Sequence, residues 1–118
     1  MLRIYILLFS FLMISPAFAQ VPVKTSASAA GLSGQDLLTM CGGLYDVDYG
    51  YCAGYMKAIA DVMGQQAVHG QTACNQGNVR PQQLLEAMKM QAADDPALAA
   101  QPASVLATQS IARSYPCR

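Results

Sequence analysis

Residues 49–66, YGYCAGYMKAIADVMGQQ, decide the fold class, because they hold the clearest amphipathic pattern in the chain. Apolar side chains recur there at steps of three and four residues: Cys52, Tyr55, Met56, Ile59, Ala60 and Met63. That period is typical of a helix with one buried face. Asp48 precedes the pattern and is a favourable N-cap, whereas Gly64 weakens the helix near its end.

Helices are also predicted on both sides of this segment. Residues 33–36, SGQD, resemble a capping box that starts a short helix. The glycine pair at 42–43 suits a left-handed cap at the end of that helix. Further along, Pro81 fits the first position of a third helix, and residues 94–96, Asp-Asp-Pro, end it.

The last helix is expected to run from Pro102, at its first position, to about residue 114. The closing Tyr115-Pro116-Cys117 then stops it, because proline cannot continue a helix. No segment alternates between polar and apolar residues as a strand does. We therefore expect an all-α fold, a small disulfide-stapled bundle of about four helices.

The first 19 residues read as a secretory signal peptide. Arg3 supplies the positive charge, residues 4–14 form an apolar run, and Ala17-Phe18-Ala19 is a small-residue cleavage pattern. The apolar run is too short to span a bilayer, so we expect cleavage after Ala19 and no membrane attachment afterwards. Residues 20–32 then form a flexible leader, and residues 33–118 form the folded domain.

All four cysteines follow the predicted cleavage site: Cys41, Cys52, Cys74 and Cys117. An even number in an exported chain predicts two disulfides, with three connectivities open. If helices joined by short connections are antiparallel neighbours, Cys41 and Cys52 share one end of the bundle and Cys74 and Cys117 the other. We favour those two pairs, although a long segment 52–74 that folds back would allow the others.

Composition argues against several function classes. The formal net charge is zero and only 12% of the residues are charged, with no basic cluster of the kind that binds nucleic acid. His69 is the only histidine, and the common hydrolase, zinc and phosphate-loop motifs are absent from the sequence. Met56, Met63 and Met88 fit a core better than a soft-metal site. We expect no enzyme activity and no cofactor.

The segment Cys52-Ala53-Gly54-Tyr55, followed by Ala58 and Asp61, resembles the helix motif of the Rap/Tai family. Members of that family are periplasmic immunity proteins that neutralise peptidoglycan amidase effectors delivered by type VI secretion. The leucine pair at 37–38 before Cys41, residues 79–85, the Asp95-Pro96 break and the closing Tyr115-Pro116-Cys117 resemble further parts of its pattern. The resemblance covers about residues 34–117.

The resemblance implies a periplasmic homodimer that binds a cognate cell-wall hydrolase effector. It also implies that a protruding loop occludes the active-site cleft of the hydrolase. In this chain the candidate loops are residues 67–78 and 94–101. The alternative is a periplasmic acid-stress chaperone of similar helical architecture. An acid switch needs many carboxylates that lose interactions on protonation, and the chain has only seven acidic residues.

Six residues are candidates for a role in the site. Gly54, with Ala58 one turn on, predicts a groove of small residues for close helix packing. We interpret Asp61 on the same side as an acceptor for backbone N–H groups of a neighbouring helix end, ahead of a partner contact. Tyr55 belongs to the buried stripe. The remaining candidates for partner contacts are Tyr45, Tyr49 and His69.

Overall fold

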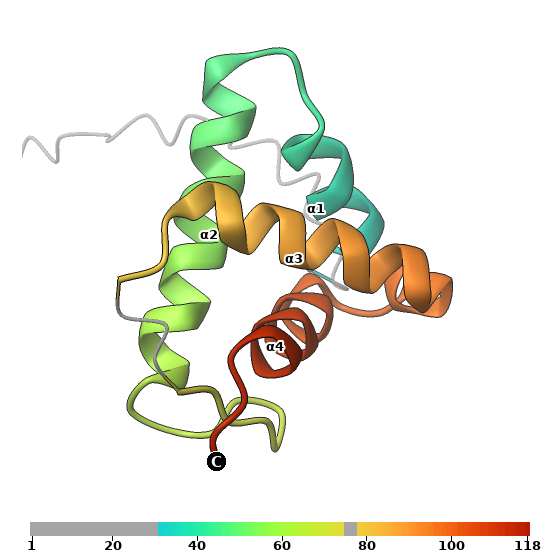
Figure 1. The fold of residues 1–118 in the computed structure, drawn as a ribbon. Helices are drawn as coiled ribbons and strands as arrows, with labels where there is room; N and C mark the ends of the chain where they lie inside the picture. The colour runs from blue at the N-terminus through green and yellow to red at the C-terminus, as the bar shows by residue number, and fades with distance from the viewer. Residues whose placement is uncertain (1–30, 75–77) are drawn as a thin grey trace, which may run out of the picture.

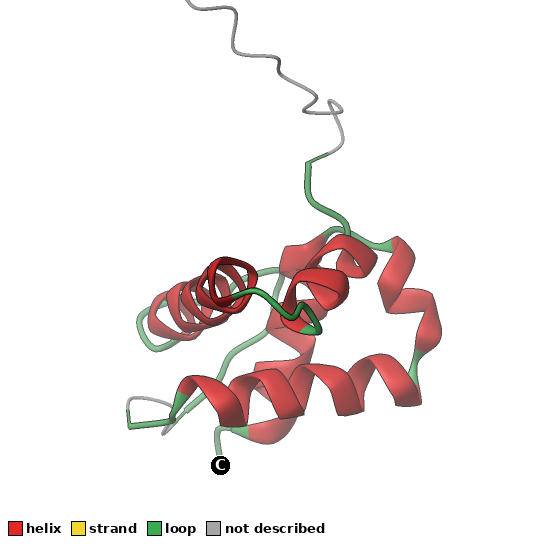
Figure 2. Cartoon of the chain, turned by 90° about the horizontal axis from the view of Figure 1, so that it is seen from above, coloured by secondary structure: helices red, strands yellow, loops and turns green. Residues whose placement is uncertain are grey.

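The computed structural model describes residues 31–74 and 78–118, and these contain four α-helices and one short 3-10 helix. The elements are α1 Gly34–Cys41, α2 Asp46–Met63, α3 Pro81–Asp94, η1 Pro96–Ala100 and α4 Ala103–Ser114. Within those ranges the chain forms no strand (Figure 1, Figure 2). The predicted all-α, disulfide-stapled bundle is confirmed. The predicted signal peptide and residues 20–30 of the leader lie outside the described residues.

Helix α2 is the longest element and organises the others. It runs the height of the molecule in Figure 1, and α3 crosses it rather than lying alongside. Helix α4 contacts α1, α2 and α3, and η1 contacts α1, α3 and α4. The connection between α1 and α2 lies at one end of α2, and the chain's C-terminus lies at the other end (Figure 1).

The core forms where the apolar faces of the four helices meet. Every residue of the predicted stripe on α2 is buried or half-buried. The three methionines that we assigned to the core are buried, since Met56 and Met88 are 0% exposed and Met63 is 3% exposed. Leucines and an isoleucine from the other helices complete it: Leu37, Leu84, Leu106 and Ile111. Buried Thr108 and Ser110 donate their hydroxyl hydrogens to carbonyls one turn back on α4, so neither leaves an unpaired polar group there.

The capping box at the start of α1 forms as the sequence predicts. The Ser33 hydroxyl accepts a hydrogen bond of 3.1 Å from the Asp36 amide, and the Asp36 carboxylate accepts one of 3.0 Å from the Ser33 amide. Hydrogen bonds from the Ser33 side chain and amide lower the pKa of Asp36. The start of α1 is therefore fixed by side-chain chemistry that residues 33–36 contain.

Three details of the predicted helix ends are wrong: the start of α2 by three residues, the start of α4 by one, and the conformation of the cap of α1. Helix α2 begins at Asp46 with Tyr45 as its N-cap, so Asp48 lies inside its first turn. Two carboxylates in that turn interact favourably with the helix dipole, which favours the earlier start. Gly42 caps α1 in a right-handed conformation, with φ −95°, instead of the expected left-handed one. Pro102 is the N-cap of α4 rather than its first residue.

Two disulfides close the fold at opposite ends of α2. Cys41 pairs with Cys52 at a Cα–Cα distance of 5.1 Å, and Cys74 pairs with Cys117 at 4.9 Å. These are the two pairs that the topological argument favoured. The connectivity follows from the fold, because the first pair joins α1 to the start of α2 and the second joins the segment after α2 to the C-terminus.

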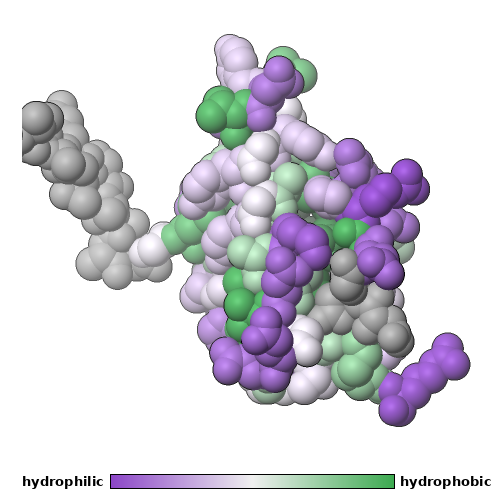
Figure 3. Space-filling view, turned by 90° about the vertical axis from the view of Figure 1, so that its left-hand side faces the viewer, coloured by the Kyte–Doolittle hydropathy of each residue, from purple (hydrophilic) through white to green (hydrophobic). Residues whose placement is uncertain are grey.

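The connection between α1 and α2 and the first turn of α2 leave apolar side chains in solvent. Leu44 is 97% exposed, Val47 is 76% exposed and Tyr45 is 73% exposed. In the space-filling view, hydrophobic residues appear at the top of the molecule, which is where Figure 1 places this connection (Figure 3). We call residues 44–48 the tip.

Candidate functional site

A short loop after α2 contains a tight turn closed by backbone hydrogen bonds. Val68 and Gln71 exchange two backbone hydrogen bonds, of 3.0 and 2.9 Å, across a two-residue turn. The two central residues, His69 and Gly70, have φ values of 48° and 72°. Positive φ at both central positions is the mark of a type I′ turn. Glycine adopts this conformation at little cost, and histidine tolerates it better than most residues do.

Three contacts anchor this loop, residues 67–74, to α4 and the C-terminal segment. The His69 Nε2 atom lies 2.8 Å from the Ser104 hydroxyl oxygen in the first turn of α4. The Cys74 amide donates a hydrogen bond of 2.8 Å to the Tyr115 carbonyl, and the Cys74–Cys117 disulfide lies beside it. Ala73, between these contacts, is 4% exposed. The loop therefore projects from the fold while its turn and its far end are both held.

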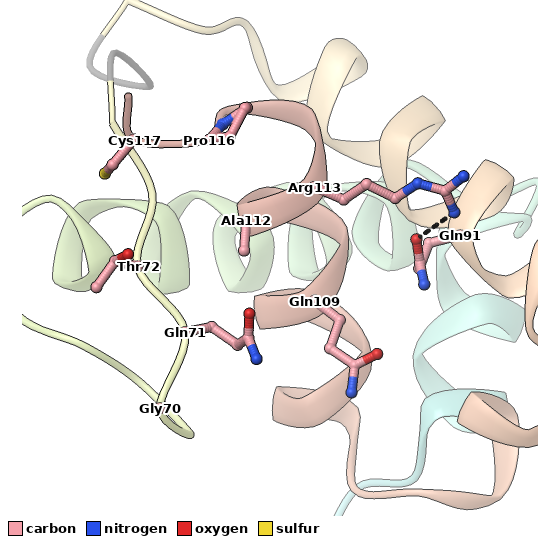
Figure 4. Close-up of a pocket in the computed structure, with 9 residues that line it drawn as sticks. All are labelled: Gly70, Gln71, Thr72, Gln91, Gln109, Ala112, Arg113, Pro116 and Cys117. Carbon is pink, nitrogen blue, oxygen red and sulfur yellow. Dashed lines mark hydrogen bonds between the residues drawn. The ribbon is translucent and has the colours of Figure 1, made fainter.

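An open hollow lies between the anchored loop and α4. Its volume is about 540 Å³. Its lining is mostly polar, and Gln71 from the loop and Gln109 from α4 extend into it (Figure 4). At its rim Arg113 donates a hydrogen bond of 2.9 Å to the Gln91 side-chain oxygen and lies 2.8 Å from an oxygen of Asp94. Amide side chains of this kind can pair with the backbone of a bound protein segment.

The other candidate loop, residues 94–101, does not project. Its centre forms η1, in which Leu98 is 4% exposed. The Gly34 amide also donates a hydrogen bond of 2.8 Å to the Gln101 carbonyl, which ties this segment to the start of α1. A Cβ atom at Gly34 would lie 2.4 Å from the Leu98 carbonyl oxygen, so the two segments pack backbone against backbone. Leu98 therefore packs the centre of this segment against the fold, while residues 94–97 stay exposed.

The structure brings two of the predicted site residues together at Ser104. Tyr55 hydrogen-bonds with the Ser104 hydroxyl, which also meets His69. Tyr51 stacks on Tyr55, with ring centroids 6.4 Å apart. Burial raises the pKa of Tyr55, the neighbouring Tyr51 adds to the rise, and the hydrogen bond with Ser104 opposes it. These contacts couple α2, the anchored loop and α4.

The other predicted site residues lie elsewhere. Tyr45 and Tyr49 are 73% and 37% exposed and lie at the opposite end of α2. Gly54 is exposed, and a Cβ atom there would meet nothing within 4 Å, so the predicted groove is not filled within the chain. Asp61 is exposed and pairs with Lys57 at 2.6 Å rather than with a helix end. This face of α2 points away from the core.

Sequence reasoning missed Ser104 and the tip leucine. Ser104 is 35 residues from His69 in sequence, and no local pattern connects two residues at that distance. Leu44 follows a Gly-Gly pair in a short connection, and an unexpected leucine in a connection is the signal that could have found it. Its exposure depends on where the connection lies relative to the core.

Neither a metal site nor a membrane span emerges from the described residues. Across residues 31–74 and 78–118 no three His, Cys, Asp or Glu side chains gather as ligands for a metal ion. In the same ranges no helix combines the length and the apolar character that crossing a bilayer requires.

Comparison with known proteins gives one match. Residues 33–117, which include all four helices and both disulfides, match the family described as Rap1a immunity proteins. No curated protein and no solved structure matches this chain significantly. The match covers well over half of the chain and has nearly the boundaries of the resemblance noted from the cysteine frame. The chain belongs to the family of Rap1a immunity proteins.

Proposed function

We propose that this chain is a periplasmic immunity protein that binds a type VI secretion peptidoglycan amidase and occludes its active-site cleft. The observation that carries the proposal is the family match over residues 33–117, the whole helical domain. The two disulfides agree with an exported protein, since such bonds persist in oxidising compartments. Export through a signal peptide cleaved after Ala19 is part of the same proposal.

The anchored loop, residues 67–74, is the proposed inhibitory element. A loop that enters a cleft binds more tightly when its conformation is fixed before binding, because less entropy is lost. The type I′ turn, the contact between His69 and Ser104 and the Cys74–Cys117 disulfide supply that preorganisation. The segment 94–101 is the alternative element, with its centre packed as η1 and Leu98 buried.

The protein acts by binding and not by catalysis in this proposal. All four cysteines are in disulfides, so no thiol nucleophile is available. Ser104 and His69 form a hydroxyl–imidazole pair, but the same hydroxyl also bonds Tyr55 and does not line the hollow beside the loop. The pair is better explained as an anchor for the loop.

The homodimer that the resemblance implies fits the outward face of α2. Tyr51, Gly54, Ala58 and Val62 share this face at helical spacing and are all exposed. The charge beside these four is an ion pair, Asp61 with Lys57, so the face adds little net charge to a two-fold contact between identical surfaces. Gly54 leaves room for a close approach. We expect Ala58→Arg to give a monomer in light scattering, with Gln82→Arg on exposed α3 as the matched control.

A loop substitution tests the proposed function directly. Gln71 is exposed in the anchored loop, and Gln71→Arg adds bulk and charge where the amidase cleft would close around it. We expect at least a tenfold weaker inhibition of peptidoglycan hydrolysis by the purified cognate amidase. Gln82→Arg, the same change on α3, should inhibit like the wild type.

Three outcomes would contradict the proposal or part of it. If the wild-type protein neither binds nor inhibits the amidase, the immunity function is wrong for this chain. If the protein instead holds many unrelated unfolded proteins after acidification, the chaperone alternative replaces it. If Gln71→Arg inhibits as well as Gln82→Arg does, the amidase is bound through another surface.

A further inference from the structure

The tip, residues 44–48, exposes apolar area that the fold of the chain does not use. Leu44, Tyr45 and Val47 are 97%, 73% and 76% exposed, and they are close neighbours in sequence. Single exposed apolar residues are common on protein surfaces, but three together mark an interaction surface more often than chance exposure. Large apolar and aromatic side chains of this kind supply much of the energy at protein interfaces.

The tip is held in one shape although it projects. The Cys41–Cys52 disulfide closes the segment at its base. The Asp48 and Tyr49 amides both donate hydrogen bonds of 3.1 Å to the Tyr45 carbonyl, which begins α2 directly beneath the tip. A Cβ atom on Gly43 would lie 2.9 Å from the Asp48 Cβ, so the two ends of the connection touch. Its apolar side chains are thus presented without the entropy cost of ordering a free loop.

The charged residues of the tip, Asp46 and Asp48, are both acidic. Residues 31–56 contain three acidic residues, Asp36, Asp46 and Asp48, and no lysine, arginine or histidine. Two of these carboxylates lie in the first turn of α2. The positive end of a helix dipole is equivalent to about half an elementary charge, so it offsets only part of the two negative charges. The surface that fits the tip is therefore apolar at its centre and basic at its rim.

We propose that the tip is a second docking surface for the amidase effector, separate from the anchored loop, and that it binds an apolar depression bordered by lysine or arginine side chains. This inference rests on the proposed function. The tip and the loop lie at opposite ends of α2 (Figure 1), which has 18 residues and a length of about 27 Å. A small protein domain has about that diameter, so one effector can contact both ends.

The two contacts have different roles. The loop blocks the cleft, whereas the tip contributes affinity through its apolar residues and speeds association through its charge. Electrostatic steering of this kind raises association rates and weakens as salt is added. The tip contact therefore predicts an association rate that falls with ionic strength, even though the protein has a formal net charge of zero.

The test measures binding of the purified cognate amidase by surface plasmon resonance at two salt concentrations, with the full oxidised mature protein. We expect the double variant Leu44→Ser, Tyr45→Ser to bind at least tenfold more weakly. We expect Asp46→Lys to slow association severalfold at low salt and to remove most of its salt dependence. The matched controls are Met90→Ser, which changes another exposed apolar residue, and Glu86→Lys, which reverses another exposed acid.

The outcomes separate this inference from the proposed function. If the wild-type chain binds the amidase and the tip variants bind equally well with unchanged circular dichroism, the tip proposal is overturned and the immunity function stands. If the wild-type chain does not bind the amidase, both are overturned, because the tip would then lack its proposed occupant. If only the tip variants lose affinity while the controls keep it, the tip is the second docking surface.

Discussion

The two ends of α2 are closed by disulfides in different ways. At its start, Cys41–Cys52 joins residues separated by 11 positions and supports a tip that stays exposed. At its far end, Cys74–Cys117 joins residues separated by 43 positions and ties the anchored loop to the C-terminus. The first crosslink shapes a local surface, whereas the second encloses α3, η1 and α4 within one covalent loop.

The two disulfides therefore differ in their main effect: one fixes the shape of a local surface, and the other stabilises the whole fold. In the chain-entropy description, a crosslink stabilises the fold more when it closes a longer loop. Loops of 11 and 43 residues correspond to roughly 3 and 4 kcal/mol in that description. A small helical domain has a thin core and depends on such crosslinks. The longer disulfide should therefore matter more for stability, and the shorter one more for binding at the tip.

Removing the longer disulfide should have the largest effect. We expect Cys74→Ser with Cys117→Ser to lower the free energy of unfolding by about 4 kcal/mol, because the unfolded chain regains the entropy of a 43-residue loop. Urea unfolding followed by circular dichroism measures the loss. A loss clearly smaller than that from removing the shorter disulfide would reverse the comparison between the two ends.

Removing the shorter disulfide should have the second-largest effect on stability. We expect Cys41→Ala with Cys52→Ala to cost about 3 kcal/mol, and alanine avoids placing a hydroxyl at two buried positions. At a temperature where the variant is still folded, its affinity for the amidase should also fall, because the tip loses its closed base. Unchanged affinity in titration calorimetry would mean that the disulfide does not shape the tip.

Substitution by alanine should change the stability of the fold in opposite directions at two glycines that lie outside both disulfide loops. Gly70 in the anchored loop has φ 72°, where an alanine side chain is strained, so Gly70→Ala should destabilise the fold by about 1 kcal/mol. Gly54 lies inside α2 with open space around it, so Gly54→Ala should stabilise the monomer by up to about 1 kcal/mol. Thermal unfolding of both variants measures the sign, and a shared sign would contradict the backbone argument.

The parts of the fold that depend on local chemistry could be predicted from the sequence. A few neighbouring residues determine each of three such features: the capping box at Ser33, the buried stripe of α2 and the start of α3 at Pro81. The spacing of the apolar residues also identified the inner face of α2, because the positions on a buried helix face are apolar and recur at the helical repeat. The same local logic placed Met56 in the core.

The parts that depend on how helices meet could not be predicted in this way. Whether Gly54 packs against a neighbour depends on which helices cover α2, and among residues 31–74 and 78–118 nothing lies within 4 Å of the position of its Cβ atom. The contact of His69 with Ser104 joins residues 35 apart and leaves no periodic signal. Leu98 anchors a segment that reads as a loop, because its pocket is built by other elements.

The smallest expected effect on stability comes from removing a single tyrosine hydroxyl, that of Tyr55, and it is compared with removal of the Tyr49 hydroxyl near the tip. Tyr55→Phe removes the hydrogen bond with Ser104, and we expect a loss of roughly 1 kcal/mol or less. Burial raises the pKa of Tyr55 in the folded chain. The unfolded chain therefore releases this proton first, so the stabilisation is complete below about pH 10 and is lost as the pH rises through the folded-state pKa. Tyr55→Phe should flatten the decline of the urea midpoint as the pH rises above about 10, and Tyr49→Phe is the matched control for loss of a tyrosine hydroxyl. An equal decline in wild type and Tyr55→Phe would show that other groups govern alkaline unfolding.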